Sequence, residues 1–289
     1  MELIYKIKKP ETILRFLKEQ SVPAKIIEME DQKPKIFVGQ VQKLFKDTVK
    51  KGDHLHVFIQ DEEYDTTIAP ENGELNVVFE DDYILVVNKP AEMQIMVTKA
   101  HPKGTLANII QQYYMDNNIK SQIHFVNRLD KESSGLILLA KNRFIKYLLS
   151  DRTPGSITRE YTALIDGVLD AKKNCINLPI GRVENSFKRE VVMNGEECET
   201  FYQVIKESNQ FSLVRILSET GKTHQIRVHF AHFYTPIVGD EIYNAKKYNV
   251  SELMLFSHRI AFTHPITDEE LDIRLDLPVV MKEMKIFRK

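Results

Sequence analysis

Short apolar runs separated by polar turns constrain the fold of this chain most strongly. "YILVV" covers residues 83–87 and is stopped by Asn-Lys-Pro, and "GLILLA" covers residues 135–140. Runs of this length, bounded by turn residues, are typical of strands buried on both faces. "EYTALID", "TFYQVIK" and "FSLVRIL" predict three more strands further along the chain.

Other segments change to a helical period. In "TLANIIQQYYM" apolar residues recur at helical spacing from Leu106 to Tyr114, and Thr105 can act as the N-cap. "RFIKYLL" (143–149) and "HQIRVHFAHF" (224–233) are also predicted helices, the latter with Thr223 as a cap. Because strands and helices are mixed without regular alternation, the chain is predicted to be an α+β protein built on a large sheet.

The first 60 residues are expected to form a small unit of their own. "ETILRFLKEQ" has a helical apolar side, and "KKGDHLHVFI" has a Gly-Asp turn leading into an alternating strand. Residues 61–76 are charged, contain Pro70 and Gly73, and have almost no apolar periodicity, so they are the predicted linker. Residues 77–289 are then the main domain.

Composition sets broad limits on the class of protein. The chain has 289 residues, 43% hydrophobic and 28% charged, which is ordinary for a globular protein. No run reaches the roughly 18 apolar residues of a membrane span, and the start lacks the apolar centre of a signal peptide, so we expect a cytoplasmic protein without membrane contact. Cys175 and Cys198 are not in a CxxC pair and are expected to be free, at least half-buried thiols. The net charge of −1 does not decide the partner.

The segment "HFVNRLDKESSGLILLAK" places Asp130 just before a predicted buried strand and close to Arg128. A polar loop supported by a rigid strand is a common location for catalytic groups. An aspartate there can equally cap the turn "DKESSG". Spacing alone leaves both interpretations open.

A second candidate is "TGKTHQIRVHFAH", in which polar and cationic residues surround a predicted helix start. Unpaired N–H groups at such a start suit an anionic partner such as phosphate, although a solvated helix start would look the same. His229 and His232 are three apart, but no acidic or cysteine ligand follows at a recognisable spacing, so no metal is expected. Phosphate-loop, dinucleotide and GxSxG motifs do not occur.

Asp130 and Glu132 raise the possibility of a glycosidase with two carboxylates. We expect the two side chains to point apart and to form no pair across a cleft, so a glycosidase is a remote alternative.

Taken together, the motifs resemble those of RluA/RluD-type RNA pseudouridine synthases, in one order from Val78 to about Lys282. Five such motifs in the family's order are strong grounds for the resemblance. The matching segments are "VVNKPAEM", "NRLDKESSGLILLAK", "REYTALIDG" with "LPIGR", "SETGKTHQIRVHFAHFYTPIVGDEIY" and "SHRIAFTHPIT".

The resemblance implies the pseudouridine synthase fold, a large mixed and mostly antiparallel sheet flanked by helices and loops. It also implies an RNA substrate, ribosomal RNA before transfer RNA, and a reaction without cofactor or metal. Asp130 is then the nucleophile acting on a flipped-out uridine, whose base is detached, turned and rejoined through carbon 5. Attack on the anomeric carbon and removal of a neighbouring sugar proton stay open as routes.

The resemblance also implies roles for further residues. Arg227 matches the active-site arginine, whose charge would keep Asp130 ionised. Tyr161 matches the tyrosine that stacks on the extruded base. Arg128 would fill the gap left in the RNA or hold a phosphate. The other residues expected to lie at the RNA are Lys89, Asn127, Lys222 and His224.

Two positions depart from the family pattern. Asn127 replaces the histidine before Arg-Leu-Asp, and Arg159 replaces the lysine of Lys-x-Tyr. Asparagine keeps a donor and an acceptor, and arginine keeps the charge, so activity is expected to survive. The effect of Asn127 on loop geometry or on the fit of the RNA is open.

Residues 11–59 resemble a degenerate copy of the small RNA-binding module named after ribosomal protein S-four. Residues 1–75 contain 12 Lys and Arg against 14 Asp and Glu, so the module lacks the strong positive charge of an ordinary RNA reader. The leading alternative to an enzyme is an RNA-binding paralogue or ribosome assembly factor that kept the fold. The presence of Asp130, Tyr161 and Arg227 favours the enzyme, which we expect to be a monomer.

Overall fold

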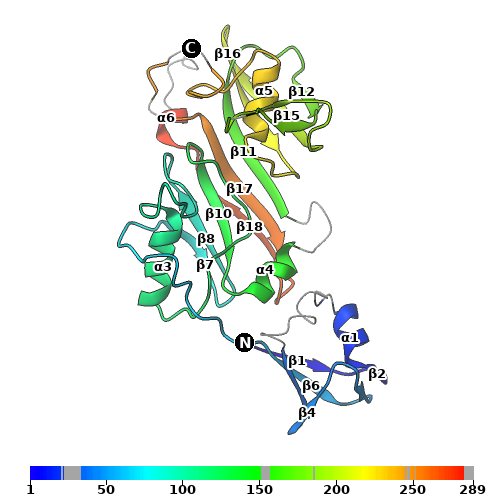
Figure 1. The fold of residues 1–289 in the computed structure, drawn as a ribbon. Helices are drawn as coiled ribbons and strands as arrows, with labels where there is room; N and C mark the ends of the chain where they lie inside the picture. The colour runs from blue at the N-terminus through cyan, green and yellow to red at the C-terminus, as the bar shows by residue number, and fades with distance from the viewer. Residues whose placement is uncertain are drawn as a thin grey trace.

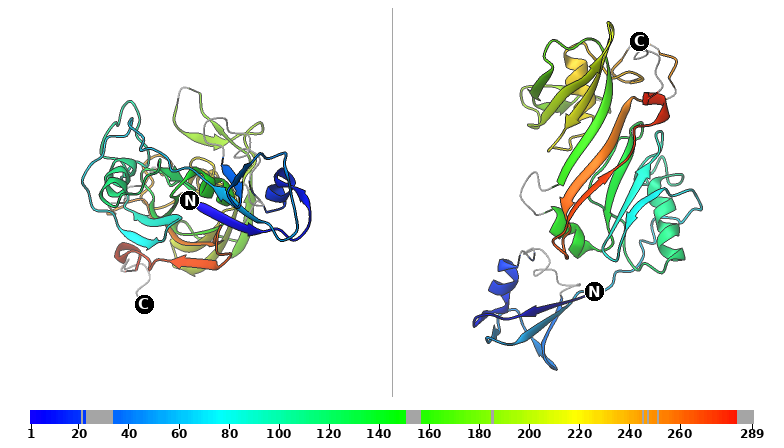
Figure 2. Two further views of the ribbon diagram at one scale, coloured as in Figure 1. Left: turned by 90° about the horizontal axis from the view of Figure 1, so that it is seen from below. Right: turned by 180° about the vertical axis from the view of Figure 1, so that it is seen from behind.

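The structure is a computed structural model that describes residues 1–20, 22, 34–150, 157–184, 186–244, 246, 248–250 and 252–282. Figure 1 shows a long sheet with helices beside it and a small N-terminal unit at one end. The views from below and behind agree with this arrangement (Figure 2). Among these described residues, no helix has the length and apolar character needed to cross a membrane.

The N-terminal unit is a four-stranded antiparallel sheet with a helix on one face. Its strand order is β1 (Glu2–Lys6), β6 (His54–Phe58), β3 (Lys35–Val38), β4 (Val41–Lys43). Helix α1 (Ile13–Glu19) begins at the N-cap Thr12, and its buried Phe16 contacts the ring of Tyr5 edge-on at 5.4 Å. Short strands β2 (Glu11–Thr12) and β5 (Thr48–Val49) pair beside it.

The main sheet has ten strands, and its only parallel pair among those described is β10 with β17. Eight strands follow the order β12-β15-β16-β11-β17-β10-β8-β7, while β18 pairs with β17 and β9 with β10. A hairpin of β13 (Ile180–Arg182) and β14 (Arg189–Val191) lies outside the sheet. The sheet strands are β7 (Val77–Glu80), β8 (Ile84–Lys89), β9 (His124–Phe125), β10 (Ser134–Ala140), β11 (Ile157–Asp166), β12 (Lys173–Asn177), β15 (Glu199–Glu207), β16 (Phe211–Leu217), β17 (Leu255–Thr263) and β18 (Glu270–Arg274).

Burial on both faces explains the apolar runs from which β8 and β10 were predicted. Successive side chains of a strand point to opposite faces. One face of the two strands contributes Ile84 and Leu138 to a core that also contains α4 (Arg143–Ser150). The other face contributes Val87 and Ile137 to a core beneath α3 (Leu106–Asp116). The α+β prediction with a mostly antiparallel sheet is confirmed.

The predicted start of α3 is confirmed, and that of α5 (Gln225–His232) is wrong in detail. Thr105 and Asn108 form a reciprocal capping box at the start of α3. At α5 the N-cap is His224, not Thr223, and its backbone is left-handed with φ 58°. No side chain caps this helix, and Oε1 of Gln225 instead accepts a hydrogen bond from the backbone N of Lys222 in the preceding turn. The last helix, α6, spans Val279–Lys282.

Residues 61–76 contain no helix or strand, yet they pack on the main sheet. Glu62 and Ile68 are each only 3% exposed. The Glu62 carboxylate lies 2.6 Å from Nε2 of His124 and accepts hydrogen bonds from the backbone of Gln122 and Arg143. Together these contacts anchor the segment to the start of β9 and the start of α4.

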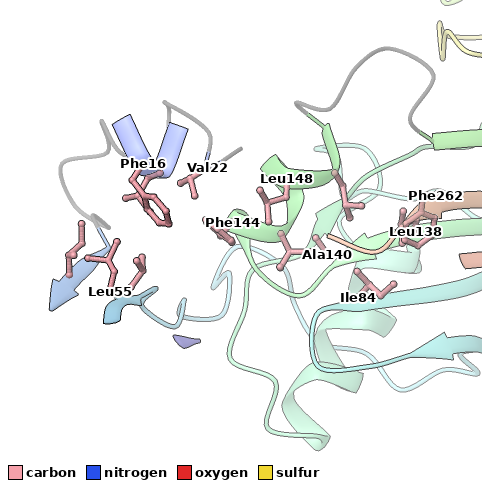
Figure 3. Close-up of a cluster of buried hydrophobic side chains, with 14 of the residues drawn as sticks. Phe16, Val22, Leu55, Ile84, Leu138, Ala140, Phe144, Leu148 and Phe262 are labelled. Carbon is pink, nitrogen blue, oxygen red and sulfur yellow. The ribbon is translucent and has the colours of Figure 1, made fainter. Parts of the chain in front are cut away.

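One apolar cluster also extends from α1 through Val22 to Phe144 and Leu148 of α4 (Figure 3). The N-terminal unit therefore shares buried side chains with the main sheet. The division into residues 1–60, 61–76 and 77–289 stays a prediction.

Candidate active site

A cavity of about 510 Å³ lies where the start of β10, the middle of β11 and the start of α5 meet. Its volume falls in the range of about 300–1,000 Å³ that is usual for small-ligand sites. The structure thus brings together side chains that lie far apart in the sequence. Those predicted for the site that line the cavity are Arg128, Asp130, Tyr161, Lys222, His224 and Arg227.

Asp130 lies in the loop between β9 and β10, with its side chain 22% exposed. Its Oδ2 accepts a hydrogen bond from Nη1 of Arg227 at 3.3 Å. Gly135 sets the end of this loop: its φ is +116°, and an added Cβ would lie 2.2 Å from the carbonyl oxygen of Ser257. Only glycine allows β10 to approach β17 so closely while supporting the Asp130 loop.

Arg227 is almost fully buried, with 1% of its side chain exposed. Its Nε and Nη2 each donate to one oxygen of Asp240 at 2.8 Å, and its Nη1 donates to Glu132 at 2.9 Å as well as to Asp130. Burial opposes its charge, but the hydrogen bonds and the charge of Asp240, with the charges of Asp130 and Glu132, raise the pKa of Arg227. The guanidinium stays charged.

The expectation that Asp130 and Glu132 point apart is wrong. Both carboxylates reach the same Nη1 atom of Arg227. Residues 130–133 form a turn in which the backbone N of Ser133 donates to the carbonyl of Asp130 at 3.2 Å, and this turn directs both side chains toward the arginine. Arg227 is therefore shared between the candidate nucleophile and a second carboxylate, Glu132, which the spacing had been expected to direct elsewhere.

Asp240 and Tyr243 are two further residues of the site that the sequence reasoning missed. The Asp240 side chain is fully buried and also accepts hydrogen bonds from the backbone of Ile242 and Tyr243. The ring of Tyr243 lies 5.5 Å from the guanidinium carbon of Arg227. The signal was present, because both residues belong to the quoted "VGDEIY" of the closing motif.

The Tyr243 hydroxyl connects two parts of the cavity wall. It accepts a hydrogen bond from the backbone N of Arg189 at 2.9 Å and lies 2.8 Å from Nδ1 of His224. The β13–β14 hairpin is thereby tied to the start of α5. Burial lowers the pKa of His224 and raises that of Tyr243, so neutral forms of both are favoured.

Tyr161 lies at the centre of β11, between Ile216 of β16 and Ser257 of β17. Its side chain is 8% exposed and lines the cavity. Burial raises the pKa of its phenol, so the ring is neutral at ordinary pH. A neutral aromatic face at this position can accept a stacked base.

Asn127 does not face the RNA side of the cavity, contrary to the expectation. It is 4% exposed, its Nδ2 donates to the carbonyl of Leu136 at 3.2 Å, and its Oδ1 accepts from the backbone N of Leu138 at 2.7 Å. The backbone pairing of β9 with β10 continues as far as Val126, whose N donates to the same Leu138. After β9 the chain diverges from β10 toward Asp130, and there the side-chain amide of Asn127 takes the place of a backbone partner for β10.

Lys89 was also expected to contact the RNA backbone, and its surroundings contradict this. The side chain is 0% exposed, and Nζ donates to the carbonyls of Pro90, Met93 and Lys131 at 2.8–3.0 Å. Burial lowers the pKa of Lys89 to about 8 against the charges of nearby carboxylates. Because all three N–H groups of its ammonium donate to backbone carbonyls, Lys89 holds the loop after β8 to the Asp130 loop.

Arg128, Lys222 and His224 remain available at the rim of the cavity. Arg128 is exposed, and the other two are half-buried, with Lys222 paired to Glu196. His229 is fully buried and lies within hydrogen-bond distance of Thr200 and of the Leu178 carbonyl.

Two further sequence predictions concern metal binding and thiols. In the part of the chain that the structure describes, no group of three or more His, Cys, Asp or Glu side chains is placed to hold a metal ion. The predicted thiols are confirmed as free, Cys198 buried and Cys175 half-buried.

Comparisons with known proteins agree with this architecture. The RNA pseudouridylate synthase family matches residues 83–232. An uncharacterised RNA pseudouridine synthase of Bacillus subtilis, YjbO, is 32% identical over 83% of this chain and 85% of its own length. Ribosomal large subunit pseudouridine synthase D of Pasteurella multocida is 30% identical over 85% of this chain and 80% of that protein. The solved structure of human RNA pseudouridylate synthase domain containing 4 has the same fold, with a TM-score of 0.59, 21% identity and coverage of 72% and 90%.

The fold and these matches define an isomerase that acts on RNA. The chain belongs to the RNA pseudouridylate synthase family, as the resemblance of its motifs implied.

Proposed function

We propose that Asp130 is the nucleophile of this pseudouridine synthase and that the cavity around it receives one extruded uridine. The observation that carries the proposal is the contact between the partly exposed Asp130 carboxylate and the buried guanidinium of Arg227 inside a cavity of nucleoside size. A fixed cation next to a carboxylate stabilises its charged form. The charged form is the one that the chemistry requires.

The reaction is an isomerisation, in which the bond from N1 of the base to the anomeric carbon breaks and a bond from C5 to that carbon forms, while C5 loses its proton and N1 gains one. The Asp130 carboxylate either attacks the anomeric carbon or removes a proton from the neighbouring sugar carbon, and both routes begin from its charged form. Arg227 orients this carboxylate through Nη1. On the family resemblance, no cofactor takes part.

Tyr161 and Arg128 are the proposed contacts with the substrate beyond the carboxylate. Extruding a base from its stack costs on the order of a few kcal/mol. Stacking the base on an aromatic ring contributes roughly 1–3 kcal/mol and so offsets much of this cost. The exposed Arg128 at the cavity rim would replace the extruded base or hold a phosphate. Lys222 and His224 border the same opening.

Ribosomal RNA is the proposed substrate, because a relative covering most of the chain is named as a ribosomal large subunit enzyme. A monomeric state and a cytoplasmic location stay predictions.

The test is to measure pseudouridine in total RNA from a strain that lacks the protein, after addition of purified wild type, Asp130→Asn or Asp116→Asn. Asp116 is an exposed aspartate at the end of α3 and provides a matched control. The wild type and Asp116→Asn should restore the same uridine sites, while Asp130→Asn restores none. Mapping these sites identifies the RNA.

Two outcomes would contradict the proposal. Equal modification by Asp130→Asn would exclude Asp130 as the nucleophile. A wild type that binds RNA but modifies no uridine would support the alternative of an RNA-binding assembly factor.

A further inference from the structure

The four-stranded N-terminal sheet has an open face that carries adjoining aromatic side chains. His56 of β6 lies directly opposite Ile4 of β1 and Phe37 of β3. The ring of Phe58 lies 5.6 Å from that of Phe37 and 6.4 Å from that of His56. We call Ile4, Phe37, His56 and Phe58, with the flanking Lys6 and Lys35, the outer sheet face.

This face is not required for the core of the unit. The alternate residues of the same strands point to the other side, where Leu55 and Val57 are 0% and 1% exposed. On the outer sheet face, Ile4 is 60% exposed and Phe58 38% exposed. Adjoining exposed apolar side chains of this kind mark an interaction site more often than isolated ones do.

Without the acidic residues 61–75, the first 60 residues have a small excess of positive charge, which favours an anionic partner over a cationic one. Residues 1–60 contain 12 Lys and Arg against 8 Asp and Glu, whereas residues 61–289 contain 28 against 33. On the outer sheet face, Lys35 lies opposite Phe58, and Lys6 lies opposite His54. The carboxylate of Glu2, which lies opposite Phe58, is paired within the same face, because its Oε1 is 2.7 Å from Nδ1 of His56.

Aromatic rings among lysines on an open sheet suit unpaired bases. Each base of a single strand has a face that can stack on a ring, and the lysines can contact the phosphates between bases. In a duplex the bases are stacked on one another and offer no such face. The chemistry of the outer sheet face therefore fits single-stranded RNA better than duplex RNA.

We propose that the outer sheet face binds an unpaired stretch of the RNA substrate, as a second contact remote from the cavity. Figure 1 shows the N-terminal sheet at the opposite end of the molecule from α5, which borders the cavity. The inference rests on the proposed function in one respect, that the substrate is a large structured RNA. Two linked contacts strengthen binding to an RNA that can reach both.

The test measures binding of the full chain to a short fluorescent oligoadenylate, which contains no uridine. Replacing both rings in Phe37→Ala/Phe58→Ala should weaken binding roughly tenfold or more, because base stacking is removed. Val41→Ala is the matched control, because Val41 of the same unit is 57% exposed and lies opposite Val38, on the other side of the sheet from Phe37. The control should bind as the wild type does.

A second variant tests the lysines separately. Lys6→Ala/Lys35→Ala should reduce the slope of log affinity against log salt by about 0.7 for each phosphate that a lysine no longer neutralises. Binding to a duplex of the same length should be unaffected by the ring variant. Unchanged thermal unfolding of each variant shows that the unit is still folded.

The outcomes separate this proposal from the proposed function. If the wild type modifies RNA but the ring variant binds oligoadenylate as tightly as the wild type does, the outer sheet face binds no single strand and the enzyme assignment stands. That result would instead favour a protein partner. If the wild type forms no pseudouridine but binds oligoadenylate through these rings, the RNA contact stands and the proposed function does not.

Discussion

Replacing Asp240 by asparagine should be among the most damaging conservative changes in the chain. The carboxylate has no exposed surface and holds Arg227, itself 1% exposed, through two hydrogen bonds of 2.8 Å. The asparagine has the same shape but no charge, and its NH₂ group would face a guanidinium donor. Removing one partner of a buried ion pair costs about 3–5 kcal/mol, because the other charge is left buried without compensation.

The geometry places the expected cost at the lower end of that range. Arg227 keeps Glu132 and Asp130 as partners, whose side chains are 30% and 22% exposed. We therefore expect a destabilisation of about 3 kcal/mol, which for a domain of this size lowers Tm by roughly 6–12 °C. Arg227 also orients Asp130, so the Asp240→Asn substitution should displace the Asp130 carboxylate as well. A displacement on the order of 1 Å should reduce kcat by about 100-fold.

Asp272 provides the matched control. It binds Arg259 through two hydrogen bonds of 2.8 and 3.1 Å, which is nearly the geometry of the Asp240 pair. The Asp272 side chain is 41% exposed, so solvent screens the interaction and Asp272→Asn should cost less than about 1 kcal/mol.

Thermal and urea unfolding of the two variants give the comparison, and pseudouridine formation gives the activity. If Asp240→Asn destabilises no more than Asp272→Asn does, burial does not set the strength of the Arg227 contacts and the reasoning fails.

Two other substitutions test the support of the Asp130 loop and the anchoring of residues 61–76. Asn127→Asp keeps the shape but places a carboxylate oxygen against the Leu136 carbonyl, so urea unfolding should reveal a destabilisation of about 1–3 kcal/mol and the assay a lower kcat; wild-type stability would contradict this role. Glu62→Gln tests the contact with His124. Burial raises the pKa of Glu62, but the hydrogen bond and charge of His124, together with the backbone hydrogen bonds from Gln122 and Arg143, lower it overall. A carboxyl with a depressed folded-state pKa contributes stability above its ordinary pKa of about 4.3, and this contribution disappears as pH falls through the folded value. The variant should therefore have a lower Tm near neutral pH and a smaller difference from wild type in acid, and parallel pH profiles would exclude the contribution.

The sequence was sufficient for the main elements of the fold because burial leaves a periodic pattern. The runs at residues 83–87 and 135–140 are apolar at every position since β8 and β10 contribute side chains to cores on both faces. The N-cap of α5 was misplaced because the helix begins at a left-handed His224 without a side-chain cap, which no local preference indicates.

Roles of polar residues were less predictable than their presence near the site. Motifs grouped Asp130, Tyr161 and Arg227, and the three side chains line one cavity. Lys89 and Asn127 belong to the same motifs, yet both point into the protein and hold backbone groups. A lysine or asparagine in a loop has the same sequence pattern whether its hydrogen-bond partner is a phosphate or a carbonyl.

The sequence by itself determined the class of fold, the family and the segment that carries the candidate nucleophile, since these depend on periodic burial and on motifs read along the chain. Only the tertiary structure decided that Arg227 is shared by Asp130, Glu132 and Asp240, and that an open aromatic face remains on the N-terminal sheet. The physical reason is that an ion pair or an exposed surface depends on distances between residues remote in the sequence, and packing sets those distances.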